Sequence, residues 1–296
     1  MKFLSASRRA LAALAALFAL GLGGQAAQAE PALWKVQGPH ATVWLFGSIH
    51  ALKSQDSWKS PRVDAALKAS DALYLEIDNA DDPSALQPLM LQYGLDPAHP
   101  LSTKLDAKEL AALDSALASL GLKEKESAME LMRPWMAGLT LSVVPLLKGG
   151  YNPQASVEHA LTVAARAQGK PVRGFETAEE QVRYLADLPP AQEVAFLDSA
   201  VDDASKGTGE IDAMVAAWEA GDTDKIAELM NADMKAKYPD LYRRLLVERN
   251  QRFAKQVADL ANGTGVYFVA VGAAHLAGPD SVQSMLVPLH LTAERQ

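Results

Sequence analysis

The chain alternates short apolar runs, rich in β-branched and aromatic residues, with long stretches of helical periodicity. Short apolar runs bounded by turn residues are typical of buried strands. Between the first two runs, the apolar spacing of 61–70 predicts a helix, which makes a β-α-β beginning. We therefore predict an α/β fold whose strands are 43–47, 72–77, 171–175 and 266–271.

Between the second strand and the last, the pattern is mostly helical, although Gly and Pro residues interrupt it. Thr177 followed three residues later by Glu180 is a capping-box pattern that starts a helix. The stretch 139–147 is apolar all round, which predicts burial, and 241–260 reads as one long helix. No linker rich in Pro, Gly or Ser divides the chain. We expect a mixed β-sheet built from terminal and central strands, with a large helical insertion and α+β character.

Two of the predicted strands end in the same motif, Gly-x-x-His. Gly47 precedes His50, and Gly272 precedes His275. A Gly lets the backbone turn sharply at the strand end, and the His then projects from the loop beyond it. Ligand sites of α/β sheets lie beyond the carboxyl ends of strands. We expect the terminal strands to meet in one sheet or two adjoining sheets, with both histidines at one site, although the motif taken singly is also typical of ordinary surface or core histidines.

Two glutamates share this placement, because Glu76 and Glu176 close the other two strands. An acid beside an apolar strand is costly unless it is paired, hydrogen-bonded or coordinating. Two His nitrogens with one or two Glu oxygens suit Zn, Mn, Co or Fe, and an open position would let a bound water ionise near neutral pH. The other Glu would then act as general base or hold a ligand His. The structural alternative makes both glutamates caps or salt-bridge partners.

A further cluster, Glu248-Arg249-Asn250, lies inside the predicted helix 241–260. Helical spacing places Arg249 near Arg252 and Phe253. One interpretation is a solvated face of ion pairs. The other directs Arg249 into the mouth of the sheet, where its planar guanidinium would pair a ligand or substrate carboxylate. The remaining histidines lack such a context and are expected to be structural or exposed: His40, His99, His159 and His290.

Residues 1–29 have the pattern of a secretory signal peptide. A basic start precedes an apolar run at 11–22 that is too short to span a membrane comfortably, and small residues at 27–29 form a cleavage site. The mature protein would begin at Glu30 and consist of one domain, 30–296. We expect a periplasmic or secreted protein, with an uncleaved amino-terminal anchor as the alternative.

Charge and composition narrow the partners. Removing the signal segment takes the formal net charge from −8 to −11, because three basic residues leave with it, and this balance argues against nucleic acid. The chain has no Cys, which excludes disulfides, thiolate metal sites and Cys nucleophiles. Any metal must therefore be held by His, carboxylate and water. No later stretch is apolar enough to predict a stable membrane span after signal cleavage.

Taken together, these segments resemble the TraB/GumN family (TraB/PrgY/GumN), whose animal relatives include the Tiki proteases. The resemblance spans nearly the whole mature chain. It implies a fold similar to erythromycin esterase, ChaN and Tiki, a metal-dependent peptidase activity, and a site made of His50, Glu76, Glu176 and His275. The matching segments are Gly47 to His50, Ser70 to Asp78, Gly169 to Thr177, Trp218 with Gly221 and Asp222, Glu248 to Asn250, and Val269 to Pro279.

Two positions depart from the family pattern. Phe175 stands where members often carry Leu, which is a conservative change, and the acidic residue before the central helix is offered only by Glu158. Neither departure removes a proposed ligand.

The expected function is an exported metal-dependent hydrolase, peptidase-like, acting on a peptide or small-molecule substrate. His50 and His275, together with Glu76 and Glu176, would hold the metal. One of the glutamates would move the proton, and Arg249 would steady a carboxylate. The alternative is a binding protein that sequesters a peptide, haem or metal without turnover, and a third possibility is an interaction module whose site has decayed. The metal, the substrate, the oligomeric state and the division of roles between the glutamates stay open.

Overall fold

The computed structural model describes residues 30–54, 58–77, 83–123, 126–204, 206 and 208–296. The predicted signal segment 1–29 lies outside the described residues. Six strands form one sheet in the order β4-β3-β5-β2-β1-β6. The strands are β1 (Leu33–Gln37), β2 (Ala41–Ser48), β3 (Ala72–Ile77), β4 (Val172–Glu176), β5 (Gly265–Gly272) and β6 (Ala293–Arg295).

The central part of the sheet is parallel. Strand β5 pairs in parallel with β2 on one side and β3 on the other, and β3 pairs in parallel with β4. Strand β1 runs antiparallel to both β2 and β6. The predicted meeting of the terminal strands in one sheet is therefore confirmed, and so is the mixed α/β fold. The parallel set comprises the strands that the sequence predicted, whereas β1 and β6 were not predicted.

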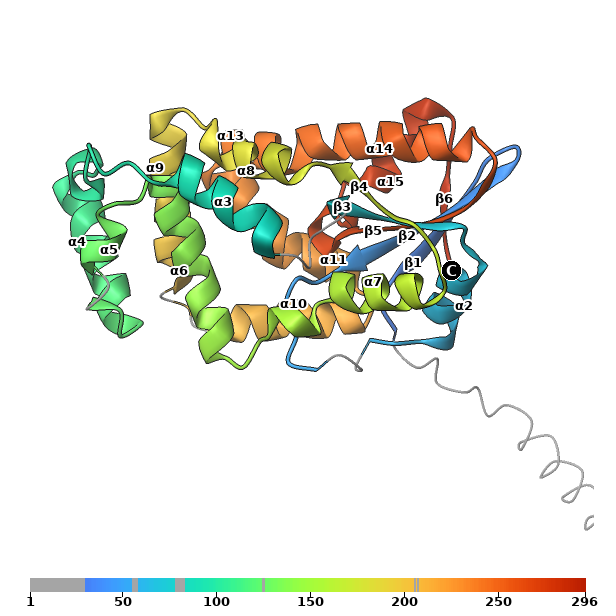
Figure 1. The fold of residues 1–296 in the computed structure, drawn as a ribbon, viewed down its shortest axis with the longest axis horizontal. Coiled ribbons are helices and arrows are strands. Elements are labelled where there is room, and N and C mark those ends of the chain that lie inside the picture. Colours follow the sequence, from blue (N-terminus) through green and yellow to red (C-terminus); the bar gives the residue numbers. More distant parts are fainter. Residues whose placement is uncertain (1–29, 55–57, 78–82, 124–125, 205, 207) are drawn as a thin grey trace, which may run out of the picture.

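Apolar side chains alternate between the two faces of the sheet and give each face its own core. Val43 and Leu45 of β2 pack with helices α14 and α15, and Phe46 packs on the opposite face. The outcome is a sheet covered by helices on both sides (Figure 1). On the first face lie α14 (Glu248–Ala261) and α15 (Val282–Leu286), and on the second lie α2 (Pro61–Ala69), α7 (Val157–Ala167), α10 (Gly209–Glu219) and α11 (Thr223–Ile226).

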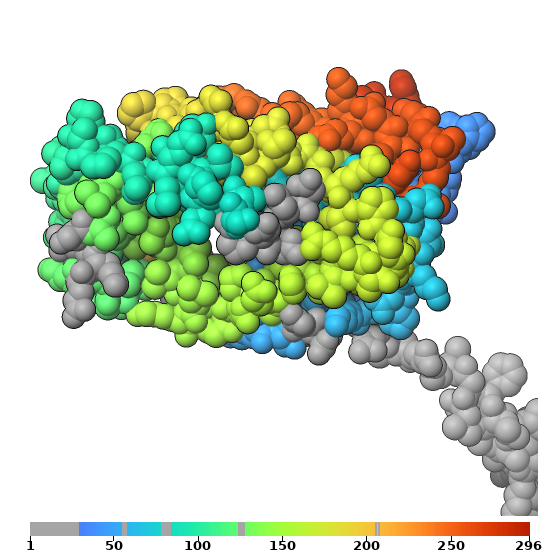
Figure 2. Space-filling view, in the orientation of Figure 1, coloured from blue at the N-terminus to red at the C-terminus, as the bar shows by residue number. Residues whose placement is uncertain are grey.

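The predicted helical insertion forms a lobe beyond the carboxyl ends of the parallel strands (Figure 1). Helices α4, α6 and α9 share one apolar core, and α3, α6 and α8 share another. The space-filling view shows the lobe and the sheet-bearing part as one continuous body on this face (Figure 2). The helices of this region are α3 (Pro83–Gly94), α4 (Ala107–Ser119), α5 (Glu126–Met129), α6 (Pro134–Lys148), α8 (Ala178–Ala186) and α9 (Pro190–Ala204).

Short helical segments complete the chain. The predicted helix 241–260 is built from α13, the π-helical segment η5 and α14, so a π turn stands directly before α14, the helix that carries Arg249. Such π turns recur at functional sites. The other segments are η1 (Leu101–Lys104), η3 (Pro153–Ala155), the π-helical η4 (Ala227–Ala232), α12 (Asp233–Lys237), α13 (Pro239–Tyr242), η5 (Arg243–Val247), η6 (Ala273–Leu276) and η7 (Val287–Leu289).

The predicted burial of 139–147 is wrong in part. Leu141 is fully buried, but Val143 is 38% exposed and Leu147 is 53% exposed. Helix α6 packs closely against α9, so its apolar surface is covered on that side and left open elsewhere. Apolar composition therefore did not ensure a neighbour on every side. In the described part of the chain, no helix is both long and apolar enough to cross a membrane.

Candidate active site at the carboxyl edge of the sheet

The carboxyl ends of the parallel strands bring the predicted site residues to one edge of the sheet. Glu76 lies near the end of β3, and Glu176 is the last residue of β4. His50 follows β2, and His275 lies in η6, which follows β5 directly. Since β2 and β5 pair in register up to their last residues, the two Gly-x-x-His loops start side by side. Arg249 reaches the same edge from α14.

Gly272 forms the floor of this site. A Cβ atom on it would lie 3.2 Å from Glu76 Oε1, 3.6 Å from His275 Cδ2 and 3.8 Å from His50 Nε2. Its backbone N–H donates a hydrogen bond to Glu76 Oε1 over 2.7 Å. The second glycine of the repeated motif therefore keeps open the space toward which both histidines and Glu76 converge.

Gly47 allows the two loops to approach each other. A Cβ atom there would lie only 3.1 Å from Ala273 Cα, tighter than ordinary packing allows without a shift. The carbonyl of Gly47 accepts a hydrogen bond from the buried Trp218 Nε1 over 2.9 Å. Trp218 therefore ties the first loop to α10. Gly221, which has a positive φ, follows the end of this helix, and Asp222 caps the next one.

Arg249 binds both glutamates. Its Nε and Nη2 donate to the two oxygens of Glu176 over 3.0 and 2.7 Å, and Nη2 also donates to Glu76 Oε2 over 2.6 Å. All three side chains are largely buried. Burial alone would favour the neutral acid, but Arg249 and the nearby histidines hold the pKa of Glu76 well below its usual range. The two carboxylates raise the pKa of Arg249 against the effect of burial.

Asn250 fixes the tautomer of His275. The amide of Asn250 donates from Nδ2 to the carbonyl of Asp280 over 2.7 Å, so its Oδ1 is an acceptor. This oxygen lies 2.5 Å from His275 Nδ1, which must therefore carry the proton. Burial lowers the pKa of His275 to about 4, so the ring is neutral near pH 7. Its Nε2 lone pair faces Arg249 Nη1 at 3.2 Å and lies 3.7 Å from Glu76 Oε1.

His50 has an oxygen partner of its own. Its Nδ1 lies 2.7 Å from Oε1 of Glu158, which is buried in the first turn of α7, while the imidazole is 72% exposed. Glu158 raises the pKa of His50 to about 9. Although burial opposes it, His50 in turn lowers the pKa of Glu158. In the sequence, Glu158 stood out only as the acidic residue before the central helix, and nothing in the family pattern linked it to His50.

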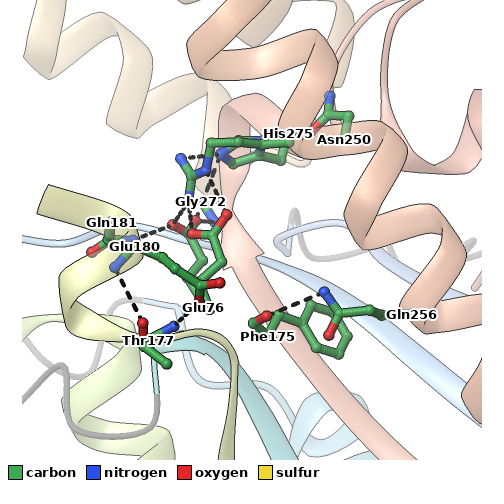
Figure 3. Close-up of polar contacts among 11 residues, drawn as sticks. Glu76, Phe175, Thr177, Glu180, Gln181, Asn250, Gln256, Gly272 and His275 are labelled. Atoms are coloured by element: carbon green, nitrogen blue, oxygen red, sulfur yellow. Dashed lines mark hydrogen bonds and ion pairs between the residues drawn. The ribbon is translucent and has the colours of Figure 1, made fainter. Parts of the chain in front are cut away.

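Other residues of the site had no sequence signal. Gln181 on α8 donates from Nε2 to Glu76 Oε2 over 3.0 Å, and Figure 3 shows it beside Glu76, with Gly272 and His275 beyond. The capping box of Thr177 and Glu180 that starts α8 is confirmed and sets the position of Gln181. Helix periodicity predicts which residues share a face, but it does not show which strand end that face meets.

The two histidines of the site are held in similar ways. Each imidazole has its Nδ1 beside an oxygen, as metal-binding histidines often do. His50 Nε2 lies near the space over Gly272, whereas His275 directs Cδ2 there and its Nε2 faces Arg249. Glu76 Oε1 borders the same space. Both oxygens of Glu176 are already taken by Arg249. Among the described residues, no group of three or more His, Asp or Glu side chains lies in an arrangement that could hold a metal ion.

Comparison with known proteins identifies the family. The sequence profile of the TraB/PrgY/gumN family matches residues 32–295. The chain belongs to this family. It is 28% identical over 246 residues to the YbaP proteins of Escherichia coli (strain K12) and Shigella flexneri, which covers 82% of this chain and 86% of each relative. A Treponema pallidum (strain Nichols) protein is 22% identical over 269 residues, covering 86% of this chain and 79% of its own length.

Family membership, predicted from the joint set of motifs, is thus confirmed. No solved structure matched the chain, so the expected likeness to the erythromycin esterase, ChaN and Tiki folds stays a prediction. The roles of the site residues, the metal and the cellular location also stay predictions.

A cavity of about 290 Å³ adjoins this TraB-family site. It is bordered by His50 and Glu76 and also by His159, which had been expected to be structural or exposed. His40 and His290 are exposed, and His99 pairs with Asp96 on the surface. The cavity lining consists of His50, Leu75, Glu76, Ile77, Leu86, Pro153, Gln154, Ser156, Glu158, His159 and Gln181.

Proposed function

We propose that this TraB-family protein is an exported, metal-dependent hydrolase that acts on peptide or amide bonds. The observation that carries the proposal is the pair of histidines at the strand ends, each with Nδ1 beside an oxygen acceptor and with its ring at the border of the space over Gly272. His50 Nε2, His275 Nε2 and Glu76 would hold a divalent ion of the Zn, Mn, Co or Fe type. Such an ion would lower the pKa of a bound water to near neutral and would polarise the carbonyl of the substrate.

The charge balance supports a bound cation. Glu76 and Glu176 carry two negative charges against the single positive charge of Arg249, and His275 is neutral near pH 7. Protonated His50 offsets Glu158, and it would release its Nε2 proton on binding a metal. The buried cluster thus keeps one uncompensated negative charge, which is expensive in a site of low polarity. A divalent cation would offset it.

The geometry also separates the two glutamates. Both oxygens of Glu176 accept hydrogen bonds from Arg249, so Glu176 orients the guanidinium. Glu76 faces the open space and serves there as ligand or proton acceptor. When His275 Nε2 is engaged by another partner, Arg249 Nη1 loses that acceptor and can donate to a substrate carboxylate or to a developing oxyanion.

The test starts with the mature chain, 30–296, purified without chelator. We expect stoichiometric divalent metal in the wild type, its loss in His50→Ala and His275→Ala, and cleavage of a mixed peptide library by the wild type alone. His290→Ala, at an exposed position, is the control and should keep both properties. If metal content and cleavage are the same in all four proteins, the proposal is wrong. Export is tested separately by the amino terminus of the protein recovered from cells, which should be Glu30.

One observation favours a second candidate, a binding protein without turnover. Arg249 already hydrogen-bonds both glutamates, so the site is held together before any metal arrives. Such a site could sequester a peptide, haem or a metal. The two candidates are separated by mass spectrometry of a peptide bound by the protein, because a sequestering protein returns the peptide intact after long incubation and a hydrolase does not.

A further inference from the structure

The cavity beside the site connects the reacting groups to an apolar wall. His50, Glu76 and Glu158 border it on the side of the metal donors proposed above. Ile77 at the end of β3 and Leu86 on α3 also line it, and so does Pro153 of η3. A substrate held at the reacting groups would therefore place the neighbouring part of its chain against residues of the sheet edge and of the helical lobe.

The carboxylates of this cavity are already paired, whereas the buried Nδ1 of His159 has no hydrogen-bond partner among the described residues. Glu158 pairs with His50. Glu76 accepts hydrogen bonds from Arg249, Gln181 and the backbone of Gly272. Among the lining residues in the described part of the chain, none is Lys, Arg or Asp. An acidic side chain entering here would lose its hydration and meet two carboxylates without gaining an ion-pair partner. A basic side chain would compete with Arg249 and His50 for carboxylates that they already pair.

The size of the cavity limits what can enter. Its volume of about 290 Å³ lies just below the usual range for small-molecule pockets, roughly 300–1,000 Å³. It therefore suits one large side chain rather than a long stretch of polymer. Leu86 is half-buried and belongs to the apolar cluster around Trp135, so the fold holds the wall that it forms in place.

We propose that this cavity is a specificity subsite for the uncharged, apolar side chain of the residue beside the bond that is cut, and that Leu86 sets its depth. The proposal rests on the proposed hydrolase function. It goes further by naming the substrate class as peptides with a Leu-, Met- or Phe-sized residue at that position.

The experiment uses the mature chain and a series of blocked hexapeptides that differ at one central residue: Ala, Val, Leu, Phe, Asp or Lys. The wild type should favour Leu and Phe, with kcat/KM falling about 10- to 200-fold per methylene removed and furthest for Asp and Lys. Leu86→Phe should fill the cavity and shift the preference toward Ala and Val. Leu86→Ala should deepen it and favour Phe over Leu.

Leu91→Ala is the matched control, because Leu91 lies on the same helix but is 50% exposed and does not line the cavity. It should leave the order of peptides unchanged. Metal content and the thermal midpoint, measured for every variant, show whether it is folded and loaded. An equal loss on all peptides in the Leu86 variants, or a wild-type preference for Asp or Lys, would overturn the subsite.

Binding constants for the same peptides, measured by calorimetry with the scissile amide reduced, separate the two proposals. If no natural peptide is cut but binding keeps the predicted order and responds to Leu86, the hydrolase proposal fails and the apolar subsite stands. If peptides are cut and neither cleavage nor binding responds to Leu86, the subsite fails and the hydrolase proposal stands.

Discussion

Two arginine–glutamate clusters with buried carboxylates lie in different parts of the molecule and differ in their charge balance. In the helical lobe, Arg133 pairs with the single carboxylate of Glu193 and donates to the carbonyls of Tyr93 and Ala186 over 3.0 and 2.7 Å. It joins α6 to the ends of α3 and α8 and leaves no net charge. At the sheet edge, Arg249 faces two carboxylates and a neutral imidazole. The first cluster is complete as it stands, whereas the second retains a negative charge that a ligand can offset.

The largest expected effect comes from removing each guanidinium. Arg133→Met and Arg249→Met both leave buried carboxylates without a counter-charge, and each should lower the free energy of unfolding by about 3–5 kcal/mol in urea denaturation. Added divalent metal should restore part of the lost stability only in Arg249→Met, because only there do His and Glu donors surround the position that the guanidinium occupied. Equal recovery in both variants, or in neither, would remove the distinction between the clusters.

A smaller effect is expected from the groups that orient the histidines. Asn250→Leu removes the oxygen partner of His275, and Glu158→Gln weakens the oxygen partner of His50. Loss of such partners typically lowers metal affinity about 10- to 100-fold. Competition with a chromogenic chelator measures this directly. Glu130→Gln is the control, because Glu130 accepts from Ser102 within the helical lobe and should not affect metal affinity. Unchanged affinity in all three variants would contradict the proposed donor set.

Next in size is the hydrogen bond that ties the first Gly-x-x-His loop to α10. Trp218→Phe leaves the carbonyl of Gly47 without its donor, which should cost about 1–3 kcal/mol beyond the lost volume. Trp58→Phe is a matched control, since Trp58 is buried in the same apolar core and its Nε1 has no hydrogen-bond partner among the described residues. The difference between the two variants in thermal unfolding isolates the bond, and no difference would show that the bond adds nothing.

The smallest effect concerns helix caps in the two regions. Thr177 caps α8, which carries Gln181 to the site, and Asp106 caps α4 in the helical lobe. Replacing either by Ala should cost about 0.5–2 kcal/mol of stability, measured by denaturation. Only Thr177→Ala should also weaken metal binding, because its helix positions the amide that binds Glu76. A loss of metal affinity in Asp106→Ala would show that the lobe and the site are more tightly coupled than their contacts indicate.

Much of the sheet could be predicted, and the reason lies in particular strands. The run that became β5 is apolar on both faces because helices cover both sides, so its pattern is strong. Strand β6 has only three residues, including Glu294 and Arg295, and exists because it pairs with β1. Strand character that comes from a partner distant in the sequence leaves little trace in the local pattern.

For the candidate site, the sequence determined the kinds of residue and their placement at strand ends. His50, Glu76, Glu176 and His275 follow or close apolar runs, and parallel strands bring such ends to one edge for reasons of backbone geometry. The sequence alone also determined the absence of Cys chemistry and membership of the TraB/PrgY/gumN family.

Only the tertiary structure decided how these residues divide their contacts. It placed Arg249 between the two glutamates. It paired His50 with Glu158 and His275 with Asn250. It also placed Glu76 beside the space over Gly272. These contacts join segments far apart in the chain, and each depends on distances of a few ångströms between helices and strand ends. Periodicity sets the face on which a side chain lies, but the packing of whole elements sets what that face meets.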